Sequence, residues 1–115
     1  MADALKPIRD RAAALPPGTW IRGFDFGQHH VAEKRVPSRR ELDDAAPNHP
    51  AVIYTIGVHM AVANSLALRL AGISRDTPNP PGGTIDRDAS GEPTGALRER
   101  AKGRLDYYRA DSVIP

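Results

Sequence analysis

The sequence predicts a mixed α/β fold, and three observations support that prediction. An unbroken apolar run from Ala51 to Ile56 is typical of a strand that is covered on both faces, as in a parallel sheet. A stretch rich in β-branched and aromatic residues, Thr19 to Gly23, precedes it and also has strand composition. A helix signal lies between the two. Strand, helix and strand within about 38 residues outline one right-handed βαβ unit.

Local signals define the helices on either side of the first strand. Four apolar residues near the N-terminus recur at helical spacing: Leu5, Ile8, Ala12 and Leu15. They predict a helix over residues 2–15 that Pro16 ends. Ser38 and Glu41 form a capping box, in which the hydroxyl and the carboxylate each satisfy a free backbone amide. The box opens a second helix, which Pro47 stops.

A turn over residues 57–59 is expected to follow the second strand. The next apolar residues again have helical spacing: Val62, Leu66, Leu70 and Ile73. They predict a helix with Gly72 as its left-handed cap. Asn64 or Ser65 is the alternative N-cap, which would start the helix a turn later.

The C-terminal third begins with a segment rich in proline and glycine, residues 77–83, that cannot form regular structure. Residues 84–87 and 94–97 then predict a small β-hairpin, with Gly91 in the turn. Apolar spacing predicts a helix over residues 98–108. The predicted core contains seven residues from these elements: Trp20, Ile21, Val52, Ile53, Leu66, Leu70 and Leu97.

Composition limits the classes of protein to which the chain can belong. Its 115 residues make one segment with no second domain, too few for a complete eight-stranded barrel of roughly 250 residues. The 16 basic and 14 acidic residues are interleaved, which argues against nucleic-acid binding. The chain has no cysteine, no apolar run near the ~18 residues of a membrane span and no secretory signal. A cytoplasmic location away from membranes is therefore expected.

Several motifs in a fixed order point to a family. They are GTWIRG (18–23), EKRVPSRRELD (33–43), VHMAVANSLAL (58–68), AGISRDTPNPPGG (71–83) and RDASGEPTGALRE (87–99). Together they resemble the metal-dependent amidohydrolases over about residues 14–101. The branch they resemble is amidohydrolase family 3, which includes N-substituted formamide deformylases.

The resemblance implies a fold and an activity for the longer parent enzyme. Such enzymes are distorted (β/α)₈ TIM barrels that hydrolyse carbon–nitrogen bonds of small amide-type substrates with divalent metal, above all zinc. Their ligands are a His-x-His, a lysine, two further histidines and an aspartate. The present sequence has no His-x-His. It therefore resembles an internal piece of the enzyme: a partial TIM barrel with a βαβ unit and a small hairpin excursion.

This absence has a chemical consequence. A hydrolytic metal needs three or more ligands and an open position for water. We therefore expect no bound metal and no catalysis from the chain alone, which would supply pocket wall and scaffold. His29 and His30 are adjacent and would point to opposite faces of an extended segment, which argues against a metal pair. The alternative is a self-standing, non-catalytic α/β binding module. Exposed strand edges would favour self-association.

Three residues are candidates for contact with substrate in the parent enzyme, and none is expected to bind metal. His59 follows a predicted strand end, where a neutral imidazole can be catalytic or hydrogen-bond a substrate carbonyl or a metal-bound water. The alternative is simple packing at the start of the next helix. Asn64 is either a substrate ligand or a helix cap. Glu99 either supplies a carboxylate near the substrate and metal or is an exposed first-turn residue.

Overall fold

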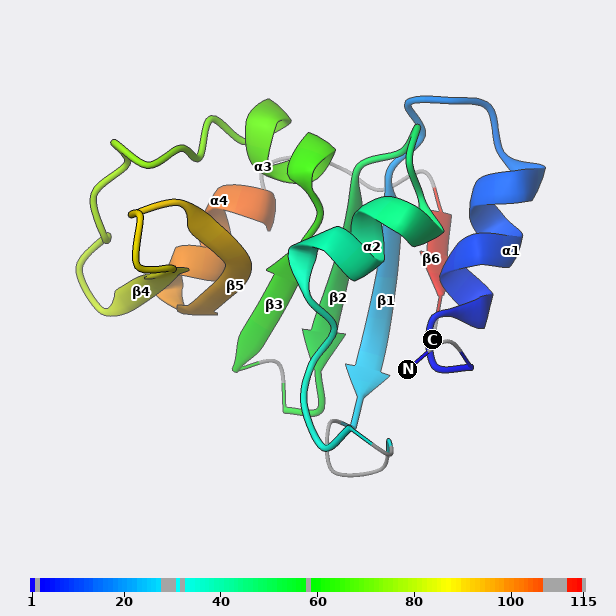
Figure 1. The fold of residues 1–115 in the computed structure, drawn as a ribbon, viewed down its shortest axis with the longest axis horizontal. Helices are drawn as coiled ribbons and strands as arrows, with labels where there is room; N and C mark the ends of the chain where they lie inside the picture. Colours follow the sequence, from blue (N-terminus) through cyan, green and yellow to red (C-terminus); the bar gives the residue numbers. More distant parts are fainter. Residues whose placement is uncertain (2, 28–30, 32, 58, 107–111, 115) are drawn as a thin grey trace.

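The computed structural model describes residues 1, 3–27, 31, 33–57, 59–106 and 112–114. The elements run in the order α1 (Lys6–Ala14), β1 (Ile21–Phe26), α2 (Arg39–Ala45), β2 (Ala51–Thr55), β3 (Met60–Ala63), α3 (Ser65–Leu70), β4 (Gly83–Arg87), β5 (Pro93–Glu99), the 3₁₀ helix η2 (Arg100–Lys102), α4 (Gly103–Asp106) and β6 (Ser112–Ile114). The strands form a six-stranded sheet in the order β4-β5-β3-β2-β1-β6 (Figure 1). β1 is parallel to β2 and β6, and the other neighbouring strands are antiparallel, so the sheet is mixed.

The predicted βαβ unit is confirmed. β1 and β2 are parallel, with Ile21 opposite Ala51, and α2 connects them along one face of the sheet (Figure 1). α2 begins at the predicted capping box, where the Glu41 amide donates to Ser38 Oγ at 3.1 Å and the Ser38 amide donates to Glu41 Oε1 at 2.8 Å. β1 starts two residues later than predicted and continues to Phe26, because pairing with β2 extends beyond the local strand signal.

The helix predicted from Val62 is wrong at its start. Residues 60–63 form β3, which pairs with β2, Val62 lying opposite Ile53. Val62, the first of the apolar residues that suggested a helix face, lies in a run of four buried residues that also fits a strand, and hydrogen bonding to β2 and β5 decides between the two. The alternative start is confirmed, since Asn64 caps α3. Gly72, with a φ of 74°, follows the helix as predicted.

The predicted hairpin is confirmed, but it is no excursion from the sheet. β4 and β5 are antiparallel, and β5 also pairs with β3, so the hairpin extends the main sheet. β5 runs through Glu99, two residues into the segment predicted as a helix. The helical part begins at Arg100 and comprises η2 and α4; residues 107–108 of the prediction lie outside the described residues.

Two apolar clusters cover the two faces of the sheet. Large members of the cluster beneath α1 and α2 are Leu5, Ile8, Ile21, Leu42 and Ile53. The cluster on the other face, against α3, η2 and α4, includes Trp20, Val52, Leu68, Leu97 and Leu105. Five of the seven predicted core residues are buried. The prediction is wrong for half-buried Leu66 and for Leu70, which is 45% exposed, because α3 begins later and presents another face to the sheet.

Candidate functional site

Strands β1, β2 and β5, together with β6, which is parallel to β1, end at the same edge of the sheet. β1 and β2 are parallel, and β5 runs in their direction because β2 and β5 are both antiparallel to β3. The last residues of β1, β2 and β5 are Phe26, Thr55 and Glu99 (Figure 1). We call this side the carboxyl edge and the opposite side, where these strands begin, the amino edge. Ligand sites in α/β folds form at the carboxyl ends of parallel strands.

The structure brings two predicted site residues, His59 and Glu99, together at the carboxyl edge. The Glu99 amide donates to the His59 carbonyl at 2.9 Å, which adds one step to the pairing of β3 with β5. The side chains meet as well, with 3.4 Å between His59 Nδ1 and Glu99 Oε1. They are 75% and 58% exposed respectively, so both can reach groups outside the chain.

The turn before His59 is held by a residue that the sequence analysis missed. Thr55 is buried, and its hydroxyl donates to the Met60 carbonyl at 3.2 Å and lies 3.3 Å from the Met60 amide. Gly57 adopts a φ of 85°, the left-handed conformation that glycine tolerates best. The signal available in the sequence was a threonine at a strand end, followed by a glycine.

Glu99 has a strained backbone. Its φ of 51° and ψ of −124° lie outside the regions that residues with a Cβ normally occupy. Such a conformation costs about 1–3 kcal/mol. The Glu99 carbonyl accepts a hydrogen bond from Lys102 Nζ at 2.9 Å, which holds the start of η2 against the strand end. Strain of this kind is concentrated at functional sites in folded proteins.

Asn64, the third candidate, lies at the amino edge, away from the other two. Its side chain is 1% exposed, and Oδ1 accepts from the Ala51 and Ala67 amides, both at 3.0 Å. Its Nδ2 donates to the carbonyls of Ala46, at 3.2 Å, and His49, at 2.7 Å. The helix-cap reading is confirmed, and the side chain joins α2, β2 and α3. A substrate contact for Asn64 stays a prediction.

Further polar groups at the amino edge also bond within the chain. Asp43 accepts from the Ser65 amide at 2.7 Å and from Ser65 Oγ at 2.6 Å. Arg39 Nε donates to Ser65 Oγ at 2.7 Å. His49 is 3% exposed, and its two ring nitrogens each lie 3.0 Å from a backbone carbonyl oxygen, those of Thr19 and Ala12. This edge is therefore built for stability.

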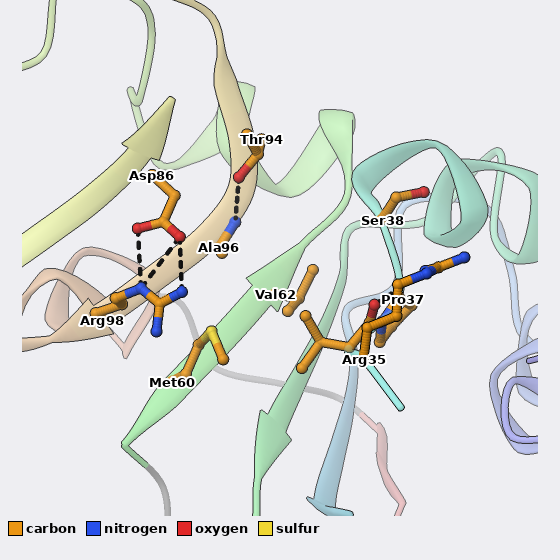
Figure 2. A pocket seen from close by; sticks show the side chains of 10 residues that line it. Arg35, Pro37, Ser38, Met60, Val62, Asp86, Thr94, Ala96 and Arg98 are labelled. Atoms are coloured by element: carbon orange, nitrogen blue, oxygen red, sulfur yellow. Dashed lines mark hydrogen bonds and ion pairs between the residues drawn. The ribbon is translucent and has the colours of Figure 1, made fainter. Parts of the chain in front are cut away.

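A groove of about 340 Å³ lies on the α2 side of the sheet, between β5 and the segment that leads into α2. Figure 2 shows Met60 and Val62 between two polar walls, with Arg98 and Asp86 on one side and Arg35 on the other. The groove contains Met60, the residue after His59, so it reaches toward the carboxyl edge.

Ion pairs neutralise the charges of both walls. Arg98 makes three contacts of 2.9 to 3.1 Å with Asp86, and this hydrogen bonding raises the pKa of Arg98. Across the groove, Arg35 donates to both oxygens of Glu41, at 2.7 and 3.1 Å. Those bonds, with the Ser38 amide, lower the pKa of Glu41 from 4.5 to about 2. The groove thus offers an apolar floor between charges that are already paired.

A buried arginine that the sequence analysis missed supports the other face. Arg22 donates to Tyr54 Oη at 2.8 Å and to the Leu105 carbonyl at 2.7 Å, and its guanidinium lies 5.0 Å from the Trp20 ring centre. Tyr54 in turn stacks on Phe24, with 5.0 Å between ring centres. These contacts attach the C-terminal helical segment to β1 and β2.

The described residues do not form a complete metal site. Within the part of the chain that the structure describes, no three His, Asp or Glu side chains are grouped so that they could hold an ion. His59 and Glu99 provide two donors, whereas a catalytic zinc site takes three protein ligands. His29 and His30 lie outside the described residues. The described helices also include none with the length and apolarity to cross a membrane.

Solved structures with a similar fold define the class of protein. Two uncharacterized metal-dependent hydrolases, from Pyrococcus horikoshii OT3 and Pyrococcus furiosus, match the chain with TM-scores of 0.60 and 0.61. They are 27% and 28% identical to it, and each match covers 90% of this chain. The matched region is 18% and 19% of the solved chains.

Sequence comparison identifies the family. The model of the amidohydrolase family matches residues 1–111, and the chain belongs to that family. It is 46% identical to an N-substituted formamide deformylase of Arthrobacter pascens, over 95% of this chain and 21% of the relative. It is 37% identical to the putative amidohydrolase YtcJ of Bacillus subtilis (strain 168), over 85% of this chain and 18% of the relative. The chain thus spans about a fifth of the length of the curated relatives it matches.

Proposed function

We propose that the chain is a scaffold and pocket-wall segment of a metal-dependent hydrolase that acts on carbon–nitrogen bonds of non-peptide amides. Family membership and the two hydrolase structures support the reaction class. The relative from Arthrobacter pascens makes N-substituted formamides the first substrates to test. The observation that carries the proposal is the exposed His59 and Glu99 pair at the carboxyl edge, where such folds bind ligands.

In this proposal β1, α2 and β2 are part of a TIM barrel, and the β3 to β5 region extends the wall beside its pocket. His59 contacts the substrate, Glu99 supports it, and Asn64 holds the scaffold in shape from the amino edge. Divalent metal, with zinc as the first choice, belongs to the parent enzyme. Because the described residues lack three grouped ligands, the chain by itself is inactive in this proposal.

Measurements on the chain by itself and on a longer polypeptide test this proposal. The purified chain, given zinc and N-methylformamide, is expected to release no methylamine and to retain no stoichiometric zinc after desalting. Chelator-sensitive release of methylamine would contradict the segment role.

The reading frame upstream is expected to encode a His-x-His, and a polypeptide that spans both parts should hydrolyse the formamide. In that polypeptide His59→Ala should lower kcat/KM by about tenfold or more through lost substrate positioning, and an unchanged kcat/KM would exclude His59 from the pocket.

A non-catalytic binding module remains the second candidate, and one feature of the outer strand favours it. β4 lies at the end of the sheet order, yet the Ile85 amide donates to Asn79 Oδ1 at 2.9 Å, and Arg87 donates to the Ile85 carbonyl at 3.2 Å. These bonds occupy edge groups that would otherwise pair with another strand. A cooperative melt of a concentration-independent monomer, with no His-x-His encoded upstream, would support the module. Self-association through strand edges stays a prediction.

A further inference from the structure

We infer that Glu99 is a positioning residue for His59: it holds the imidazole with its proton on Nδ1, so that Nε2 offers a lone pair to a hydrogen-bond donor. The position of the proton does not depend on the proposed function. Only the identity of the ligand that Nε2 contacts rests on it. The expected partner is an N–H or a water proton, and a carbonyl oxygen is excluded because it can only accept.

The first step of the argument is that the two backbones are held together. Met60 pairs with Arg98 in the register of β3 and β5, and the bond from the Glu99 amide to the His59 carbonyl continues that pairing by one residue. Two exposed side chains that met by chance would lack such a constraint. The separation of the two backbones is therefore set by the sheet, and the two side chains start from neighbouring positions.

The second step is the conformation of Glu99. A glycine would adopt a φ of 51° and a ψ of −124° readily, whereas a glutamate adopts them only under strain. Local backbone preference therefore does not account for a glutamate here. The strained conformation places a carboxylate beside His59, with Oε1 3.4 Å from Nδ1.

The third step is the chemistry of the pair. An ionised carboxylate only accepts hydrogen bonds, and a neutral imidazole has one N–H. The electrostatically favoured arrangement puts that N–H at Nδ1, toward Oε1, and leaves the lone pair at Nε2. The lack of a side chain at Gly57 leaves space beside Nε2 of His59. A Cβ at position 57 would lie 3.1 Å from Cδ2 and 3.4 Å from Nε2 of that ring.

The inference predicts a measurable proton position in the chain without any ligand. Nitrogen-15 NMR under basic conditions should show a larger share of the Nδ1-protonated ring at His59 than in a variant that lacks the Glu99 carboxylate. In Glu99→Ala the ratio of Nδ1-protonated to Nε2-protonated ring should fall about threefold, the size expected from the loss of one solvent-exposed hydrogen-bond acceptor. Glu99→Gln, which keeps an accepting oxygen, should restore most of the ratio. His59→Gln assigns the signal, and the distant, buried His49 should not change.

A second variant, Glu99→Gly, tests whether misfolding explains a changed ratio in Glu99→Ala. It removes the carboxylate and also relieves the backbone strain. It should lose the Nδ1 preference as Glu99→Ala does. An equal ratio in the unaltered chain and in both the alanine and glycine variants would overturn the inference. Absence of hydrolysis by the longer polypeptide would instead refute the proposed function, and it would leave this ratio as it is.

Discussion

The two edges of the sheet use polar residues in opposite ways. At the amino edge, Asn64 and His49 are buried and bonded to backbone groups of several elements. At the carboxyl edge, His59 and Glu99 are exposed, touch at 3.4 Å and rest on a strained backbone. Satisfied buried polar groups stabilise a fold, whereas exposed and strained ones are available for a ligand. In the proposed function, stability and ligand contact therefore belong to opposite ends of the same strands.

The largest effect is expected from Asn64→Ala. It removes a helix cap and leaves buried backbone groups of Ala46, His49, Ala51 and Ala67 without these partners. The free energy of unfolding should fall by about 3 kcal/mol or more, measured by denaturant titration. The matched control is Asn48→Ala at an exposed position, with an expected loss below about 1 kcal/mol. Equal losses would contradict the structural role of the amino edge.

The next effect is expected from Gly95→Ala, where β5 approaches β3 near the amino edge. Gly95 has a φ of 107°, and an added Cβ would lie 2.6 Å from the Ala63 carbonyl oxygen. Strain and clash together should lower the free energy of unfolding by about 2 to 3 kcal/mol. The control is Gly18→Ala. Gly18 has a φ of 90°, but an added Cβ would have no neighbour within 4 Å, so this variant measures the backbone strain without the clash. A loss at Gly95 no larger than at Gly18 would exclude the close approach.

Glu41, in the capping box of α2, should make stability depend on pH. Its pKa is lowered to about 2 by Arg35 and the Ser38 amide, against 4.5 ordinarily. Its contribution is thus complete above pH 4.5 and is lost as pH falls toward 2. Between pH 7 and pH 3 the unaltered chain should lose about 1 kcal/mol more than Glu41→Gln, in denaturant unfolding at both pH values. Parallel losses would show that the Arg35 pair contributes nothing.

At the carboxyl edge, Glu99→Gly is expected to raise stability. It relieves the backbone strain and removes an exposed side chain whose loss costs little, so the gain should be about 0.5 to 1 kcal/mol in denaturant unfolding. The control is Gly103→Ala, which has open space around it and no positive φ. A clear loss of stability in Glu99→Gly would show that Glu99 has a structural role like that of Asn64.

The smallest effect is expected from His59→Ala. The side chain is 75% exposed, and the ion-pair contact at 3.4 Å is weak in solvent. The free energy of unfolding, measured by denaturant titration, should therefore change by no more than about 0.5 kcal/mol. His49→Ala is the matched comparison, because that ring is buried between two carbonyls, and it should lower stability clearly. Similar values for the two histidines would remove the contrast between the edges.

The sequence alone determined the features that depend on neighbouring residues. The capping box at Ser38 and Glu41, the Asn64 cap considered as an alternative, the hairpin and the βαβ unit all follow from local hydrogen bonding and apolar spacing. It also indicated His59 and Glu99 separately as site candidates and carried the motifs of the family. Each of these signals lies within a few residues, or within one connected unit, of the structure it predicts.

Only the tertiary structure decided which long-range pairings form. Val62 lies in a strand because β2 and β5 supply hydrogen-bond partners on both sides. The helix α3 therefore starts after β3, and Leu70 falls on its exposed face. The same pairing of β3 with β5 brings His59 beside Glu99, 40 positions apart in the chain, and places Asn64 at the far edge. A short apolar run does not distinguish a buried strand from a buried helix turn, because both can be apolar on every side, and the partner strands make the difference.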